Sequence, residues 1–196
     1  MNLNPINKIV LDTCIILYSV DDNTRDSCKS IISKFEENGN RICCSALSCF
    51  EVLKNRQDEV NEKDYVTFIN KIPRIPVDTP TLANASTLYF LYKKTNRIQE
   101  KKETFDPKDK LTGDLIIGGS TLSHQNHLLL TSNKKDFPDE FWEIKLEFNI
   151  DCKDNNQIKA FLLEPKMNEI ISVLPVNSLQ KPENWPTRKN LYDYRG

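Results

Sequence analysis

The chain has 196 residues, of which 38% are hydrophobic and 28% charged, and its formal net charge is −1. This composition is typical of a globular domain with a full core. The net charge excludes a uniform polycation, so nucleic acid would have to bind at a local basic patch. No apolar run reaches the ~18 residues of a membrane span, and the start, MNLNPINK, lacks the apolar core of a signal peptide. We therefore expect a cytoplasmic protein with no membrane partner.

The chain contains six cysteines: Cys14, Cys28, Cys43, Cys44, Cys49 and Cys152. The adjacent pair in the middle and the irregular spacing fit neither a zinc knuckle nor a disulfide framework. Free cysteine is among the most buried residue types. We therefore expect buried free thiols.

The first predicted strand, 7–11, has no polar alternation, as expected of a central parallel strand that is covered on both faces. Asp12 follows at its carboxyl end. Residues 13–20 are predicted to continue as a helix or tight turn. Apolar residues at helical spacing predict a helix over 24–38, which Gly39 ends.

A short extended segment, 41–44, precedes a helix predicted over 45–56. The apolar residues of this helix are expected to face the body of the protein, and they are Leu47, Phe50, Val52 and Leu53. Glu51 lies on or beside that stripe, where an unpaired buried carboxylate is costly. We therefore expect Glu51 to have a cation or a proton as its partner.

Helices are also predicted over 62–71 and from 78 or 79 to about 97, with a short strand at 75–77 between them. The polar, lysine-rich segment 98–110 is predicted as a mobile loop or a helix extension. A helix over 112–123 follows, capped by Thr112.

Asp114 is expected in the first turn of that helix, and Asp136 lies just beyond the buried strand predicted at 128–131. Alternation of apolar and polar residues predicts an edge strand over 144–150. Two short helices are predicted after it, over 156–164 and 166–173. Pro165 separates them, because proline interrupts a helix.

Strands that alternate with helices predict an α/β fold with a mainly parallel sheet of four to five strands and helices on both faces. The edge strand can be antiparallel. We expect one domain over 1–150 and a helical or irregular extension over 151–196.

The candidate site residues are four acids, Asp12, Glu51, Asp114 and Asp136. Singly, each has a structural explanation as a helix cap, a first-turn acid or a turn residue. Together they are expected at one edge of the sheet, where open α/β sheets place their sites. Carboxylates gathered there would raise one another's pKa, and a hard dication, Mg²⁺ or Mn²⁺ rather than zinc, would relieve the repulsion.

Four motifs carry a family resemblance: V-L-D-T-C at 10–14, F-E-V-L at 50–53, G-D-L-I-I at 113–117 and L-L-T-S-N-K-K-D-F at 129–137. In order and spacing they resemble the PIN-domain nucleases, and among these the VapC-type toxins of bacterial toxin–antitoxin pairs. The resemblance covers about residues 7–146. It implies a three-layer α/β/α sandwich and a metal-dependent endoribonuclease, a hydrolase that leaves 5′-phosphate and 3′-hydroxyl ends on RNA.

Carried over by motif, the resemblance implies that all four acids are catalytic and that Mg²⁺ or Mn²⁺ is held by Asp12, Asp114 and Asp136. Thr131 and Asn133 match polar positions that steady the carboxylates or the substrate. The implied partners are RNA and, for a toxin, an antitoxin protein that occludes the acidic pocket. A homodimer is a further expectation.

Three features depart from the family: the long basic segment 97–111, the pair Gly118–Gly119 and the tail beyond residue 150. Each helical glycine costs about 1 kcal/mol against alanine, which predicts close packing on the sheet. Four lysines of the basic segment are weak candidates for RNA-phosphate contacts, with a solvated face as the alternative; they are Lys101, Lys102, Lys108 and Lys110.

Three further residue types are interpreted structurally. His124 and His127 are expected to be exposed in a turn rather than to bind zinc, because no further ligand pattern accompanies them. Cys14 is expected to be a small core residue, and Trp142 is expected to pack beside the edge strand.

Two other classes of function stay open. The chain can be a catalytically idle PIN-like module that binds RNA or a protein partner, although the presence of all four acids argues against this. It can also be a small-molecule enzyme, but neither G-x-G-x-x-G nor a Walker A loop is present.

Overall fold

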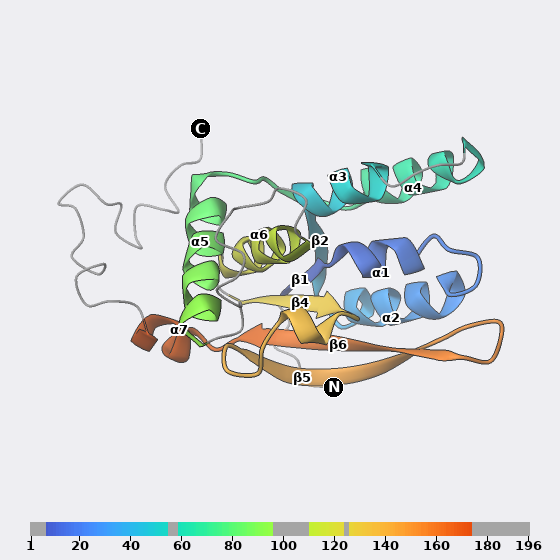
Figure 1. The fold of residues 1–196 in the computed structure, drawn as a ribbon. Coiled ribbons are helices and arrows are strands. Elements are labelled where there is room, and N and C mark those ends of the chain that lie inside the picture. Colours follow the sequence, from blue (N-terminus) through green and yellow to red (C-terminus); the bar gives the residue numbers. More distant parts are fainter. Residues whose placement is uncertain (1–6, 55–58, 96–109, 124–125, 174–196) are drawn as a thin grey trace.

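The computed structural model describes residues 7–54, 59–95, 110–123 and 126–173 (Figure 1). One sheet of six strands runs through it in the order β3-β2-β1-β4-β6-β5. The strands are β1 (Lys8–Leu11), β2 (Arg41–Ser45), β3 (Arg74–Ile75), β4 (His127–Thr131), β5 (Trp142–Asp151) and β6 (Gln157–Pro165). The predicted α/β class is confirmed, with one strand more than expected.

The helices are α1 (Thr13–Tyr18), α2 (Arg25–Glu37), α3 (Ala46–Lys54), α4 (Glu59–Lys71), α5 (Thr79–Lys94), α6 (Lys110–Leu122) and α7 (Met167–Val173), and a 3-10 turn, η1, spans Lys134–Asp136. Two apolar cores lie on opposite faces of the sheet. Helices α1 to α4 cover one core and α5 to α7 the other (Figure 1). The protein therefore has three layers, α/β/α. No helix in the described ranges has the length and apolar character needed to cross a membrane.

Strand β1 lies at the centre of the parallel part of the sheet, between β2 and β4. Its residues Ile9, Val10 and Leu11 are fully buried, because successive side chains of a central strand enter the two cores in alternation. Both neighbours run parallel to β1, so the carboxyl ends of the three strands meet at one edge of the sheet. That edge carries Asp12 and the residues that follow Thr131.

The helix predicted over 156–164 is wrong, because these residues form β6. This strand lies between β4 and β5 and is antiparallel to both. A tight turn connects β5 to β6, with Asn155 in the left-handed conformation at φ 64°. The sheet therefore continues past residue 150, where the domain boundary was predicted, and β5 is the outer strand as expected.

The predicted helix 166–173 is confirmed as α7, and Gly39 ends α2 with φ 80°. One prediction about α3 is wrong. The side chains of Phe50 and Leu53 are 58% and 37% exposed instead of facing the core.

Helix α6 begins at Lys110, so Thr112 does not cap it and Asp114 lies beyond the first turn. The paired glycines of α6 do allow close packing, Gly119 against α5 and Gly118 against both α5 and Trp142 of β5. A Cβ on Gly118 would lie 2.9 Å from Leu88 Cδ1, and a Cβ on Gly119 would lie 2.5 Å from the carbonyl oxygen of Thr81. The contact holds α6 tightly against α5, and α6 positions Asp114.

Candidate functional site

The first acid, Asp12, is held at the carboxyl end of β1 by hydrogen bonds from two elements, α1 and β4. Its carboxylate accepts from the backbone N–H of Thr13 at 2.6 Å, as the cap of α1, and from Thr131 Oγ1 at the end of β4, also at 2.6 Å. Asp12 is only 3% exposed. Burial raises its pKa above the ordinary value, and the nearby charge of Asp136 adds to that effect.

Glu51 reaches the same place from α3. Thr13 Oγ1 donates to Glu51 Oε2 at 2.5 Å. The other carboxylate oxygen, Oε1, lies against Gly113 of α6, where a Cβ would collide with it. Burial is the main reason that the pKa of Glu51 is raised, and Asp12 contributes to the rise. We expected a cation or a proton as the partner of this carboxylate. Glu51 has a hydrogen bond from the Thr13 hydroxyl group and, as a nearby cation, Lys54, whose charge lowers its pKa.

Asp114 lies near the start of α6. Burial, followed by the charges of Asp12 and Asp136, raises its pKa from 3.8 to about 8, and Glu51 acts in the same direction. A charge acts on a pKa in this way when it lies nearby in the folded chain. The structure thus brings together all four acids that the sequence singled out.

Asp136 lies in η1, directly after β4. Asn133 Nδ2 donates a hydrogen bond to Asp136 Oδ2, and the backbone N–H of Asn133 donates to Thr131 Oγ1 at 2.9 Å. Thr131 in turn holds Asp12. The two polar residues predicted to steady the carboxylates therefore form a hydrogen-bonded chain from Asp12 to Asp136.

The chemistry of this acidic cluster, Asp12, Glu51, Asp114 and Asp136, suits a hard cation. The donors are carboxylate oxygens, which Mg²⁺ and Mn²⁺ prefer. Burial and the neighbouring acids raise the pKa of Asp114 to about 8, so a cation would compensate the negative charge that this site otherwise disfavours. In the described ranges, no three His, Cys, Asp or Glu side chains already stand as a metal-ligand group. Coordination would therefore require the carboxylates to rotate toward a common point.

Cys14 packs against the core, as the sequence indicated, and it also borders the acidic cluster. Its Sγ lies 3.3 Å from Asp12 Oδ2 and accepts a hydrogen bond from the backbone N–H of Ser132 at 3.3 Å. Burial raises the pKa of the thiol to about 12, and Asp12 adds to the rise. The sequence signal that could have placed Cys14 beside the acidic cluster is its position two residues after Asp12, in the first turn of α1.

The remaining candidates fall outside the acidic cluster. His127 is buried at the start of β4, so the prediction of an exposed imidazole is wrong, and His124 lies outside the described residues. The lysines 101, 102 and 108 also lie outside them, and Lys110 begins α6 without a described side chain. Trp142 is fully buried and donates from Nε1 to Tyr92 Oη at 3.0 Å.

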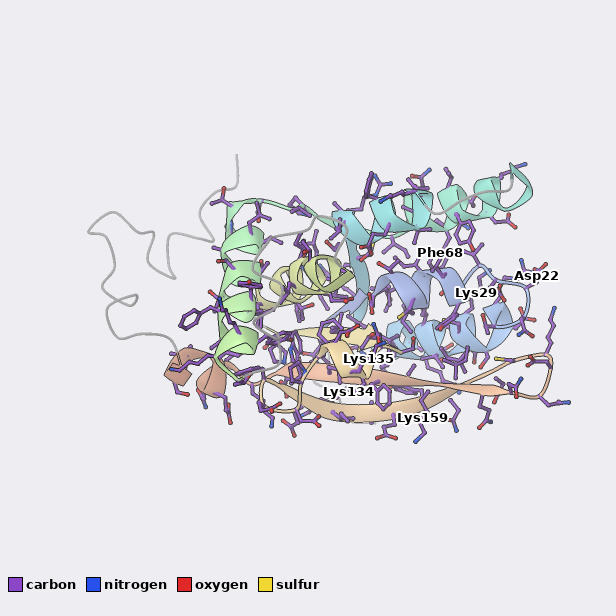
Figure 2. All side chains as sticks on the ribbon, viewed as in Figure 1. Asp22, Lys29, Phe68, Lys134, Lys135 and Lys159 are labelled. Carbon is purple, nitrogen blue, oxygen red and sulfur yellow. The ribbon has the colours of Figure 1, made fainter. Side chains whose placement is uncertain are left out.

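Two lysines next to Asp136 were not singled out from the sequence. Lys134 donates to the carbonyl of Phe137 at 2.6 Å and pairs with Asp139 at 2.7 Å, so it closes the turn around Asp136. Lys135 is exposed on the same turn (Figure 2). The sequence signal that could have identified these two lysines is the N-K-K-D-F motif, which contains both of them.

A separate groove of about 470 Å³ lies between α2 and α4, and none of the four acids lines it. Lys29 of α2 and Phe68 of α4 are among its lining residues (Figure 2). Its other charged residues have both signs, as in Arg25, Asp64 and Lys71. The groove and the acidic cluster are thus different features of the surface.

No protein-family model matches the sequence, and no curated protein matches it. A solved chain of VapBC2 from Rickettsia felis, bound to a DNA fragment from their promoter, superposes with a TM-score of 0.50 at 20% identity, over 66% of this chain and 90% of that chain. DNA-bound VapBC from Salmonella typhimurium has a TM-score of 0.48 and 18% identity, over 67% of this chain and 90% of that chain. FitAcB from Neisseria gonorrhoeae has a TM-score of 0.47 and 14% identity, over 66% of this chain and 90% of that chain. The first of these shows a shared fold.

Proposed function

We propose that the chain is a Mg²⁺- or Mn²⁺-dependent endoribonuclease of the PIN-domain type. The observation that carries the proposal is the acidic cluster, in which four carboxyl groups come from distant parts of the sequence. Burial, with the charges of neighbouring acids, raises the pKa of Asp12, Glu51 and Asp114. Burying four such groups together is unfavourable unless a cation or a proton compensates. Phosphodiester hydrolysis uses this arrangement, because a dication can offset both the carboxylates and the phosphate.

In this proposal Asp12, Asp114 and Asp136 would hold the metal, which would supply Lewis-acid polarisation of the phosphodiester and of the attacking water. Thr131 fixes the orientation of Asp12 and Asn133 that of Asp136. Glu51 is anchored through Oε2 by Thr13, so Oε1 is the oxygen that can orient a water molecule. Attack of that water on phosphorus breaks the bond to the 3′-oxygen, which leaves as a hydroxyl.

The comparison adds a partner to the proposal. The Rickettsia felis protein of the same fold was solved as VapBC2 on a fragment of promoter DNA. We propose that this chain likewise acts as the toxin of a toxin–antitoxin pair, with RNA as its substrate, an antitoxin as its protein partner and a homodimer as its assembly. A basic side chain of the antitoxin would neutralise the acidic cluster in place of the metal.

The test is cleavage of a fluorescently labelled single-stranded RNA by the purified chain, with Mg²⁺ or with EDTA. We expect cleavage with Mg²⁺ only, and a loss of at least about 100-fold in Asp114→Asn, which removes one ligand. The matched control is Asp26→Asn, which removes an exposed carboxylate of α2. Mn²⁺ binding by calorimetry without any cleavage would instead favour the idle, RNA-binding or partner-binding module.

A further inference from the structure

Two buried thiols face each other where β2 turns into α3. Cys44 is the penultimate residue of β2, and Cys49 lies in the first turns of α3. Their Sγ atoms are 3.3 Å apart and hydrogen-bonded. Cys44 is fully buried and Cys49 is 6% exposed, so an oxidant would reach the pair through Cys49.

The other described thiols have different neighbours. Cys43 points to the opposite face of the sheet, where its Sγ lies 3.6 Å from the carbonyl oxygen of Ile9. Cys28 contacts the hydroxyl group of Ser19 at 3.2 Å. These thiols supply controls, because they are buried in the same protein without the close thiol neighbour that Cys44 has.

We propose that Cys44 and Cys49 form a dithiol–disulfide site that low-molecular-weight disulfides, such as oxidised glutathione, can oxidise. A disulfide requires an S–S distance of about 2.05 Å, so the two sulfurs have to approach by only about 1.2 Å. Cys49 is the attacking thiol, because the hydrogen bond with Cys44, followed by the charge of Arg74, lowers its pKa. Arg74 lies next to Cys44 in the sheet register.

The proposed oxidation is a thiol–disulfide exchange, in which atoms and electrons balance. The Cys49 thiolate attacks one sulfur of oxidised glutathione, forms a mixed disulfide and releases one glutathione thiolate. Cys44 then loses its proton to solvent, attacks Cys49 Sγ and releases the second glutathione. Two protein thiols are oxidised to one disulfide, and one glutathione disulfide is reduced to two thiols.

The bond would act on the acidic cluster through α3. Glu51 follows Cys49 by two residues in the same helix, and it contacts both Thr13 and Gly113. Drawing the start of α3 toward β2 therefore moves the carboxylate of Glu51. This consequence rests on the proposed function, whereas the disulfide itself does not.

The experiment treats the full native chain with oxidised glutathione, traps remaining thiols with N-ethylmaleimide in denaturant, and maps tryptic peptides by mass spectrometry. Cleavage after Arg41 and Lys54 yields one peptide, 42–54, with Cys43, Cys44 and Cys49. We expect this peptide to carry one N-ethylmaleimide group and to weigh about 2 Da less than the dithiol peptide with the same single adduct. Backbone fragments should form between Cys43 and Cys44 but not between Cys44 and Cys49.

Each other pattern overturns the proposal: unchanged thiols, stable glutathione adducts alone, or fragments that place the bond at Cys43. In Cys44→Ala we expect Cys49 to stop at the glutathione adduct, and in Cys28→Ala we expect the disulfide to form as in wild type. If Cys44→Ala does not fold, the wild-type peptide map decides by itself. RNA cleavage is not needed for this result, so the disulfide and the nuclease proposal can fail separately.

Discussion

Neutralising one carboxyl group of the acidic cluster should stabilise the metal-free protein. The variant is Asp114→Asn, which keeps the shape of the side chain and cannot ionise. In wild type, burial and the neighbouring acids raise the pKa of Asp114 from 3.8 to about 8. Between these values the folded protein keeps a proton that the unfolded chain releases, so this group makes stability fall as pH rises toward about 8.

The magnitude follows from the same shift. Each pKa unit corresponds to about 1.4 kcal/mol, which sets an upper limit of roughly 6 kcal/mol. The carboxyl group is half-buried rather than sealed, so solvent screening reduces the expected effect to about 2–3 kcal/mol. Asp114→Asn should therefore exceed wild type in free energy of unfolding by this amount at about pH 8 and match it at about pH 4.

The assay is urea unfolding in EDTA at several pH values, with Asp26→Asn as the control for loss of an exposed charge. Saturating Mg²⁺ should then make wild type the more stable of the two proteins. A ligand at 100 times its Kd adds about 2.7 kcal/mol to the free energy of unfolding of the protein that binds it. An Asp114→Asn protein that is no more stable than wild type at about pH 8 would refute the reasoning. It would mean that the four carboxylates do not repel one another in the folded chain.

Three further predictions concern neighbours of the acidic cluster. Gly113→Ala should keep the urea-unfolding midpoint of wild type but lower RNA cleavage, because the added Cβ displaces only the end of the Glu51 side chain. Gly119→Ala should instead lose about 2–4 kcal/mol of unfolding free energy in urea, because its added Cβ meets the backbone of α5. Thr131→Val should cost about 1–3 kcal/mol of unfolding free energy, since it removes the hydroxyl donor at Oδ2 of the buried Asp12 carboxylate. Trp142→Phe should cost about 1–3 kcal/mol in a thermal melt through the lost hydrogen bond to Tyr92; no loss would contradict the buried contact.

The sequence predicted the centre of the fold well because local chemistry determines it. Ile9 to Leu11 and Leu128 to Leu130 are unbroken apolar runs, which only strands covered on both faces require. Parallel pairing then brings Asp12 and Asp136 to one edge. Glu51 was found for a different reason, since a carboxylate beside apolar helix residues needs a specific partner.

The parts that were mispredicted depend on distant contacts. In β6 the apolar residues Ile158 and Leu162 are spaced as in a helix, and only pairing with β4 and β5 selects the strand. Phe50 and Leu53 are apolar but exposed, because α3 turns Cys49 and Val52 toward the core instead. The contact of Cys14 with Asp12 likewise depends on how α1 leaves the sheet.

The position of β6 also affects how the chain can be completed during synthesis. The outer edge of β4 is covered by β6 and not by β5, which precedes it in sequence. Until the ribosome has released residues up to Pro165, the hydrogen-bonding groups on that side of β4 have no native strand beside them. A nascent or truncated chain that stops near residue 151 would present an open apolar strand edge, the kind of surface that recruits other chains into aggregates.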